Sequence, residues 1–128
     1  MRDHTKLRAF ELADQLAVLV YQHTASFPTR EQFGLQSQMR RAAVSVACNI
    51  VEGCARHSKA DYIRWLDIAY GSARELEYQS GLARRPGFLN DTSSQALAPM
   101  VEETCKVLNG LLRSLRSSSP ASSLPSPA

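Results

Sequence analysis

The residue types that most often bind transition metals come close together once, at Cys48, Cys54 and His57. A zinc site needs four ligands, and two ligands three residues apart without a second pair do not make a zinc motif. A di-iron site in a helical bundle uses glutamates followed three residues later by histidine. None of the seven glutamates has such a histidine, so we expect no bound metal.

Residues for nucleophilic or phosphate chemistry are equally sparse. The sequence has no Gly-rich phosphate loop, no nucleophile elbow and no dinucleotide fingerprint. His23 falls at helical spacing among apolar residues, which predicts a core histidine, and His4 and His57 lie near segment ends, where we expect them in water. The sequence predicts a protein that is not an enzyme and holds no cofactor.

Glycine and proline divide the 128 residues into four segments with helical periodicity. Three of them cover about 6–24, 35–56 and 59–84, and the fourth begins near residues 90–92 and ends at about 116. Four amphipathic helices with short connections predict an all-α fold, an antiparallel, up-down-up-down four-helix bundle, over residues 1–116. Residues 117–128 are rich in serine and proline, which predicts a disordered tail.

Nothing in the sequence predicts contact with a membrane. The longest apolar run, residues 16–21, is far shorter than the roughly 20 residues of a membrane-spanning helix. Charged residues near the amino terminus interrupt any secretory leader, and three cysteines without C-x-x-C spacing fit reduced thiols. We therefore expect a cytoplasmic protein.

The second helical segment is apolar on two faces rather than one. One face continues the pattern of the core, and the opposite face consists of Val44, Ala47, Cys48, Val51 and Cys54. A helix that is apolar nearly all round is buried on more than one side, so the second face predicts an interface between copies of the chain. The alternative is that these mostly small residues tolerate exposure to water.

Polar residues form a line along the same segment. The line consists of Gln38, Arg41, Ser45, Asn49 and Glu52 on the second segment, and Ser72, Glu75 and Gln79 lie beside the apolar face of the third. An antiparallel pair of helices could place Arg41 against Glu75 and Asn49 near Ser72. We favour an internal network that fixes helix register over a ligand site.

Positive charge gathers at one end of the predicted bundle, although the whole chain carries only +3. The basic residues at that end are Arg2, Lys6, Arg8, Arg56, Lys59, Arg64, Arg113 and Arg116. The same end holds the carboxylates of Asp3, Glu52 and Asp61. Eight positive against three negative charges would attract the phosphates of RNA or DNA; the alternative is a solvated surface. Tyr62 and Trp65 are expected in the core, Arg40 is a second candidate cation and Arg41 is assigned to the internal network.

Two blocks of sequence carry a family resemblance. They read Phe27-Pro28-x-x-Glu31-x-x-Gly34-Leu35-x-x-Gln38-x-Arg40-Arg41-Ala42-x-x-Ser45-Val46-x-x-Asn49-Ile50-x-Glu52-Gly53 and Tyr62-Ile63-x-x-Leu66-x-Ile68-Ala69-x-Gly71-Ser72-x-x-Glu75-Leu76-Glu77. Over about residues 7–115 the chain resembles the four-helix bundle family encoded within intervening sequences of bacterial large-subunit ribosomal RNA.

The resemblance implies a left-handed up-down bundle and a homopentameric ring. It also points to accessory proteins of diversity-generating retroelements, which are basic nucleic-acid binders that contact a reverse transcriptase. The family has no established enzymatic activity. Two features depart from its pattern: Ala47 stands where the family often has proline, and the Ser/Pro tail has no counterpart.

Two functions therefore stand as expectations. In the first, an oligomeric bundle binds RNA or DNA phosphates through its basic end. In the second, the ring is an adaptor that binds a protein partner and no nucleic acid. Binding to a generic RNA at two salt concentrations separates them.

Overall fold

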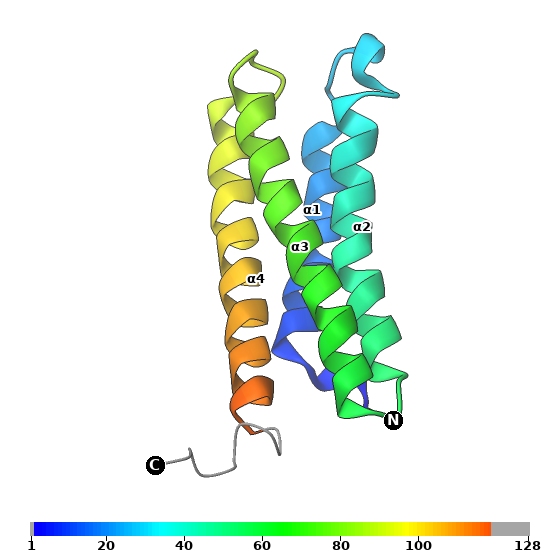
Figure 1. Cartoon of the computed structure of the whole chain (residues 1–128). Helices are drawn as coiled ribbons and strands as arrows, with labels where there is room; N and C mark the ends of the chain where they lie inside the picture. Colours follow the sequence, from blue (N-terminus) through cyan, green and yellow to red (C-terminus); the bar gives the residue numbers. More distant parts are fainter. Residues whose placement is uncertain (1, 119–128) are drawn as a thin grey trace.

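Four long helices make up most of the residues that the structure describes. The computed structural model describes residues 2–118, and in these it contains α1 (Arg8–Thr24), α2 (Leu35–Cys54), α3 (Lys59–Arg84) and α4 (Asp91–Ser117), with no strand. Two short 3-10 turns, η1 (His4–Lys6) and η2 (Thr29–Glu31), precede α1 and α2. Successive helices run in opposite directions (Figure 1).

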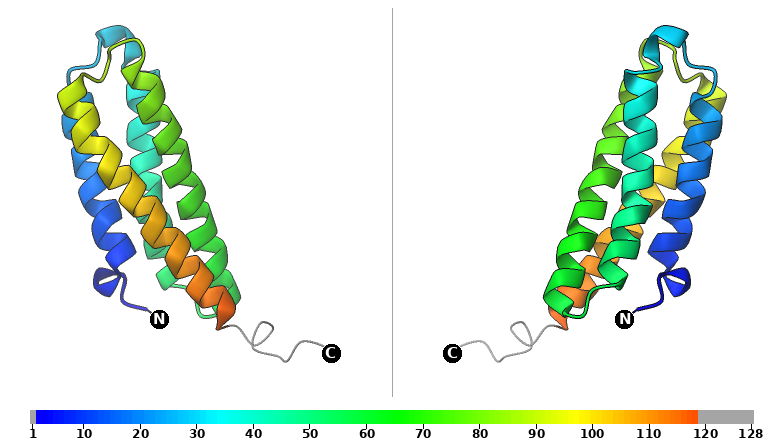
Figure 2. Two further views of the ribbon diagram at one scale, coloured as in Figure 1. Left: turned by 90° about the vertical axis from the view of Figure 1, so that its left-hand side faces the viewer. Right: turned by 90° about the vertical axis from the view of Figure 1, so that its right-hand side faces the viewer.

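Each helix packs on two others, which closes the four into a bundle (Figures 1 and 2). Contacts join α1 to α2, α2 to α3 and α3 to α4, and α4 returns to α1. The predicted all-α four-helix bundle is confirmed, and the predicted helix bounds hold to within two residues, which is the ordinary uncertainty of a frayed end. Ser117 still belongs to α4. The rest of the predicted tail, residues 119–128, lies outside the described residues.

Local capping explains where α3 and α4 begin. The Ser58 hydroxyl accepts a hydrogen bond from the Asp61 main-chain N–H at 3.1 Å, and the Asn90 side chain accepts one from the Ser93 N–H at 2.8 Å. Both satisfy main-chain donors that a helix start leaves without partners. Pro99 lies inside α4, and the helix begins at Asp91, before this proline.

The core is a column of aliphatic side chains between the four helices. It is built mainly from leucine, with Met39 and Ile50 from α2 and small alanines such as Ala69 and Ala73 from α3. Two buried threonines satisfy their hydroxyls locally: Thr24 donates to the Val20 carbonyl and Thr104 donates to a carbonyl one turn earlier, each at 2.7 Å. A buried polar group with a partner avoids the desolvation penalty of an unpaired one.

Gly53 lies where α2 comes closest to α3. A Cβ atom at this position would lie 3.0 Å from the Trp65 Cβ and 3.3 Å from both the Tyr62 ring and the Tyr62 carbonyl oxygen. Two of these neighbours are backbone or the root of a side chain, so they cannot move without moving α3. The close approach of the two helices therefore requires glycine.

The connection from α1 to α2 is fastened by side chains of α2. Arg40 donates from Nε to the Thr24 hydroxyl at 2.9 Å and from Nη2 to the Tyr21 carbonyl at 3.2 Å, and Gln36 donates to the Thr24 carbonyl at 2.7 Å. These bonds cover carbonyl groups that the end of α1 leaves unpaired. Arg40, a second candidate for nucleic-acid binding, therefore also fastens the end of α1.

The predicted polar network forms only in its middle. The hydroxyls of Ser45 and Ser72 lie 2.9 Å apart across α2 and α3, and the Asn49 amide donates to the Ser45 carbonyl and hydroxyl at 2.8 and 2.9 Å. Gln38 and Arg41 are exposed at one end of this line.

The predicted pair of Arg41 with Glu75 is wrong. Both residues border the same shallow hollow, but the Glu75 carboxylate accepts a hydrogen bond from Gln79, one turn along its own helix, at 3.0 Å. Glu52 forms an ion pair with Arg56 and does not join the network. Arg41 makes no ion pair within residues 2–118. Side chains one turn apart on the same helix are neighbours however the other helices are placed. The bond between Gln79 and Glu75 within α3 therefore forms in place of a pair between α2 and α3.

We expect Gly53→Ala to lower the free energy of unfolding by about 1–3 kcal/mol, because the added methyl group overpacks the α2–α3 contact. Gly71→Ala is the matched control: it lies in the interior of α3, where a methyl group would have no neighbour within 4 Å, and it should raise stability by about 0.5–1 kcal/mol. Urea unfolding followed by circular dichroism measures both. Equal effects of the two substitutions would contradict the close contact.

The neighbouring arginines Arg40 and Arg41 should differ in their effect on stability. Arg40→Ala removes two hydrogen bonds to the end of α1 and should cost about 1–2 kcal/mol. Arg41→Ala should change the unfolding free energy by less than about 0.5 kcal/mol, as for an ordinary surface residue. The urea midpoints of the two variants, each compared with wild type, measure these losses of stability. A larger loss for Arg41→Ala than for Arg40→Ala would contradict the prediction.

Candidate nucleic-acid interface

The predicted basic residues do meet at one end of the bundle. There the start of α1, the connection from α2 to α3 and the end of α4 lie together (Figures 1 and 2). The amino-terminal segment is fastened to this end, because the Arg2 main-chain N–H donates to the Cys54 carbonyl at 2.9 Å. We call Lys6, Arg8, Arg56, Lys59, Arg64, Arg113 and Arg116 the basic end.

Aromatic rings at this end are interleaved with arginines. The guanidinium carbons of Arg56 and Arg64 lie 5.3 and 5.0 Å from the centre of the Trp65 ring, and that of Arg2 lies 4.0 Å from the centre of Tyr62. These distances are those of cation–π contacts. Tyr62 is buried as expected, but Trp65 is only half-buried, so the prediction of a core position for Trp65 holds only in part.

The Trp65 ring also has an unusual polar group. Its Nε1 is buried and has no hydrogen-bond partner within the described residues, whereas a buried indole N–H usually finds one. The Nε atom of Arg56 is likewise buried and has no hydrogen-bond partner within the described residues. Helical periodicity gives no hint of this arrangement, because it places Trp65 on the inner face of its helix.

Carboxylates neutralise more of the basic end than the sequence predicts. Exposed ion pairs join Arg8 to Glu11 at 3.3 Å, Arg64 to Asp61 at 3.6 Å, Arg56 to Glu52 and Arg116 to Asp67. With Glu11 and Asp67 included, eight positive charges face five negative ones rather than three. Exposed pairs of this kind contribute only about 0–1 kcal/mol each, so an incoming phosphate can displace the carboxylate.

The remaining cations of the basic end are more open. Lys59 Nζ donates to the Ser118 hydroxyl at 2.9 Å. Lys6 and Arg113 are exposed, and no carboxylate of residues 2–118 forms an ion pair with them. The basic end thus offers cations from three elements that are separate in the sequence.

The predicted apolar interface is only partly exposed. Val44, Cys48 and Val51 lie at spacings of three and four residues on one face of α2, with Val44 and Val51 exposed by 38% and 36%, and Ala47 on the same face is half-buried. Cys54 is the exception: it is buried in the core and cannot contact another copy. Burial raises the pKa of the Cys54 thiol, so it is protonated at neutral pH.

The histidines are dispersed. His23 Nδ1 lies 2.9 Å from the Ser93 hydroxyl and links α1 to α4, while His4 is half-buried against the edge of Phe10 rather than fully in water. His57 is exposed at the connection from α2 to α3. Among residues 2–118, no three histidine, cysteine or acidic side chains gather in a way that could hold a metal ion.

None of the described helices combines the length and the apolar character needed to cross a membrane.

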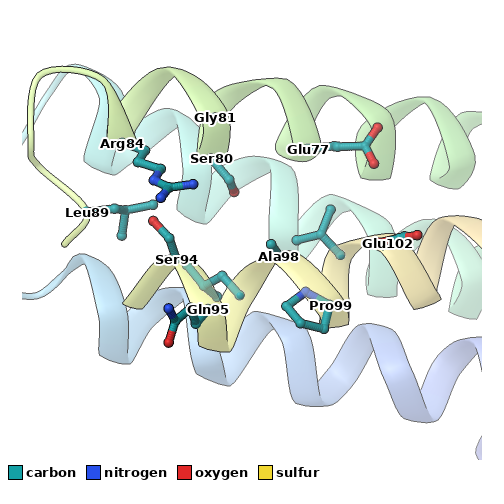
Figure 3. Close-up of a pocket in the computed structure, with 12 residues that line it drawn as sticks. Glu77, Ser80, Gly81, Arg84, Leu89, Ser94, Gln95, Ala98, Pro99 and Glu102 are labelled. Carbon is teal, nitrogen blue, oxygen red and sulfur yellow. The ribbon is translucent and has the colours of Figure 1, made fainter. Parts of the chain in front are cut away.

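A groove between α3 and α4 has no counterpart among the predicted features (Figure 3). Its volume is about 470 Å³, and its lining includes Leu89 and Leu97. The hydroxyls of Ser80 and Ser94 lie at its wall, buried and without partners in the described chain. Acidic and basic side chains both border it, so unlike the basic end it offers no excess of positive charge to a polyanion.

Comparison with known proteins agrees with this architecture. No curated protein matches the chain. A crystal structure of a protein of unknown function from the S23 ribosomal protein family of Bacteroides thetaiotaomicron aligns with a TM-score of 0.74 and 24% sequence identity, covering 82% of this chain and 95% of that one. At that identity the likeness shows the fold. Residues 5–110 match the family described as 23S rRNA-intervening sequence protein, and since this match spans most of the bundle, the chain belongs to that family.

Proposed function

We propose that this protein is a self-associating four-helix bundle that binds RNA or DNA phosphates through its basic end and catalyses no reaction. The observation that carries the proposal is the gathering of cations from the helix ends around Trp65. Cations clustered on one face attract polyanions through a term that does not depend on base sequence.

The contacts of the basic end favour phosphates as the ligands. Arginine and lysine bind phosphate oxygens through charge-assisted hydrogen bonds, and four of the arginines already hold carboxylates, which carry similar charge and oxygen acceptors. The guanidinium groups of Arg56 and Arg64 both lie in cation–π contact with the Trp65 ring. Phosphate contacts position a nucleic acid without reading its sequence.

Self-association would multiply this charge. The outer face of α2, with Val44, Ala47, Cys48 and Val51, is the apolar surface that a second copy would cover. The resemblance to the family implies five copies. A ring would repeat the basic end around one axis, and linked binding sites raise the apparent affinity without any new contact.

A protein-binding adaptor is the second candidate function. The exposed side chains Val18, Ile68 and Tyr78 lie outside the outer face of α2 and favour this adaptor function, because apolar residues on a surface can mark a protein interface.

For either function the cytoplasm is the proposed location, since Cys48, Cys54 and Cys105 are all free thiols.

Binding of a generic single-stranded RNA should be steep in salt concentration. We expect Arg56→Ala combined with Lys59→Ala to reduce the slope of log K against log salt by about 0.7 for every phosphate that the variant no longer binds. Arg85→Ala combined with Lys106→Ala removes the same charge outside the basic end and should bind more like wild type. Fluorescence anisotropy at several salt concentrations measures the slopes, and circular dichroism checks the fold. Absence of binding even at low salt would favour the adaptor.

Alkylation of cysteines should report self-association. Cys48 should react in the folded protein, whereas Cys54 and Cys105 should not, because both are buried and burial raises the pKa of the Cys105 thiol to about 11. If copies cover the outer face of α2, the Cys48 rate should fall as protein concentration rises, and Val44→Glu with Val51→Glu should restore it. Sedimentation should then give the mass of one chain, 14.1 kDa. A wild-type monomer at every concentration would refute the interface.

A further inference from the structure

A second hollow lies at the end of the bundle opposite the basic end. It is bounded by the end of α1, by η2 and by the first turns of α2, and its volume is about 480 Å³. Its lining includes Tyr21, Gln32, Phe33, Gln36, Arg40 and Arg41. We call this feature the α1–α2 hollow.

Phe33 at the rim of the hollow is exposed by 89%, although the same corner has an aromatic anchor of its own. Phe27 is buried there, with its ring centre 5.8 Å from that of Phe88. The corner therefore folds without burying Phe33. A ring left in water beside a hollow is suited to stacking against a flat ligand, and nucleobases are the flat ligands that protein aromatics stack on most generally.

The hollow also carries positive charge without a compensating carboxylate. Arg40 is held in place by Thr24 and Tyr21, and its guanidinium carbon lies 4.6 Å from the centre of the Tyr21 ring. Arg41 is exposed and makes no ion pair within the described chain. The nearby Glu31 carboxylate is not among the lining groups and caps α2, accepting from the Leu35 N–H at 3.1 Å. The lining of the α1–α2 hollow therefore holds two cations and no acid.

We propose that the α1–α2 hollow binds one unpaired nucleotide of a single-stranded nucleic acid, with the base stacked on Phe33 and the adjoining phosphate on Arg41. This inference rests on the proposed function, since the rest of the strand would lie toward the basic end. A duplex does not fit this role, because its bases are stacked on one another and offer no free face. Gln32, exposed beside Phe33, adds an amide that can bond a base edge without selecting one base.

The separation of the two binding regions sets the length of strand required. α2 has 20 residues and runs between the two ends, which is about 30 Å at 1.5 Å per residue. A stacked strand advances about 3.4 Å per nucleotide, so about nine nucleotides join the hollow to the basic end. A 12-nucleotide strand can occupy both regions at once, and a 4-nucleotide strand can occupy only one.

The test compares Phe33→Ala and Arg41→Gln with two matched controls, Tyr78→Ala and Arg85→Gln. Tyr78 is an aromatic residue exposed by 64% on α3, and Arg85 is an exposed arginine that follows α3. The probes are a labelled 12-nucleotide single strand, the same strand with abasic sites throughout, a 12-base-pair duplex, a 4-nucleotide strand and a nucleoside monophosphate. Anisotropy gives the affinities. The fluorescence of Trp65, the only tryptophan of the chain, reports occupation of the basic end independently.

We expect Phe33→Ala to weaken binding of the 12-nucleotide strand about 5- to 140-fold, the range for removal of one base stacked on an aromatic ring. Arg41→Gln should lower the salt slope by about 0.7. The abasic strand and the duplex should bind the wild type and Phe33→Ala equally, and both controls should bind like wild type. The change in Trp65 fluorescence at saturation should be the same in wild type and Phe33→Ala, and the 12-nucleotide strand should bind much more tightly than the 4-nucleotide strand.

Three results would overturn the inference. If Phe33→Ala binds the 12-nucleotide strand within twofold of wild type while Trp65 still responds, the hollow takes no base and the basic end alone binds. If a nucleoside monophosphate saturates the hollow but strand binding does not depend on Phe33, the occupant is a free nucleotide. If neither binding nor a Trp65 response occurs at low salt, the proposed function fails together with this inference.

Discussion

The contact between α2 and α3 at Gly53 is the constraint on which both the core and the basic end depend. Because Gly53 has no side chain, the Cβ of Trp65 and the ring and carbonyl oxygen of Tyr62 can lie directly against α2. That closeness fixes where both aromatic rings can go, and the rings in turn place Arg2, Arg56 and Arg64 beside them. A packing requirement inside the bundle thus determines the arrangement of charge on its surface.

Helix positions and the core follow from the sequence because they depend on local chemistry repeated many times. Each helix is specified by several apolar positions at helical spacing, and an error at one position is corrected by the others. Capping side chains such as Ser58 and Asn90 act within three residues of themselves. Such short-range interactions can be read without knowing how the helices are placed.

Pairings between helices could not be predicted in the same way. Arg40 and Arg41 are neighbours in the sequence, but they are separated by about 100° around α2. Arg40 therefore forms hydrogen bonds with the end of α1, whereas Arg41 is exposed to water. The sequence pattern predicts the opposite, with Arg41 in the internal network and Arg40 free to bind a ligand. The predicted pair of Glu75 with Arg41 fails for a related reason, because Glu75 has its partner on its own helix. The predicted interface position of Cys54 fails because this side chain is buried in the core at the end of α2.

Pro99 has a consequence for how the bundle opens. Proline has no N–H to give to the preceding turn of α4, and next to it the α3–α4 groove leaves the hydroxyls of Ser80 and Ser94 unbonded within the described chain. The first two turns of α4 are therefore held by fewer polar interactions than an uninterrupted helix would have. We expect their backbone amides to exchange with deuterated water before those of the aliphatic core, so that local unfolding of the bundle starts at this corner.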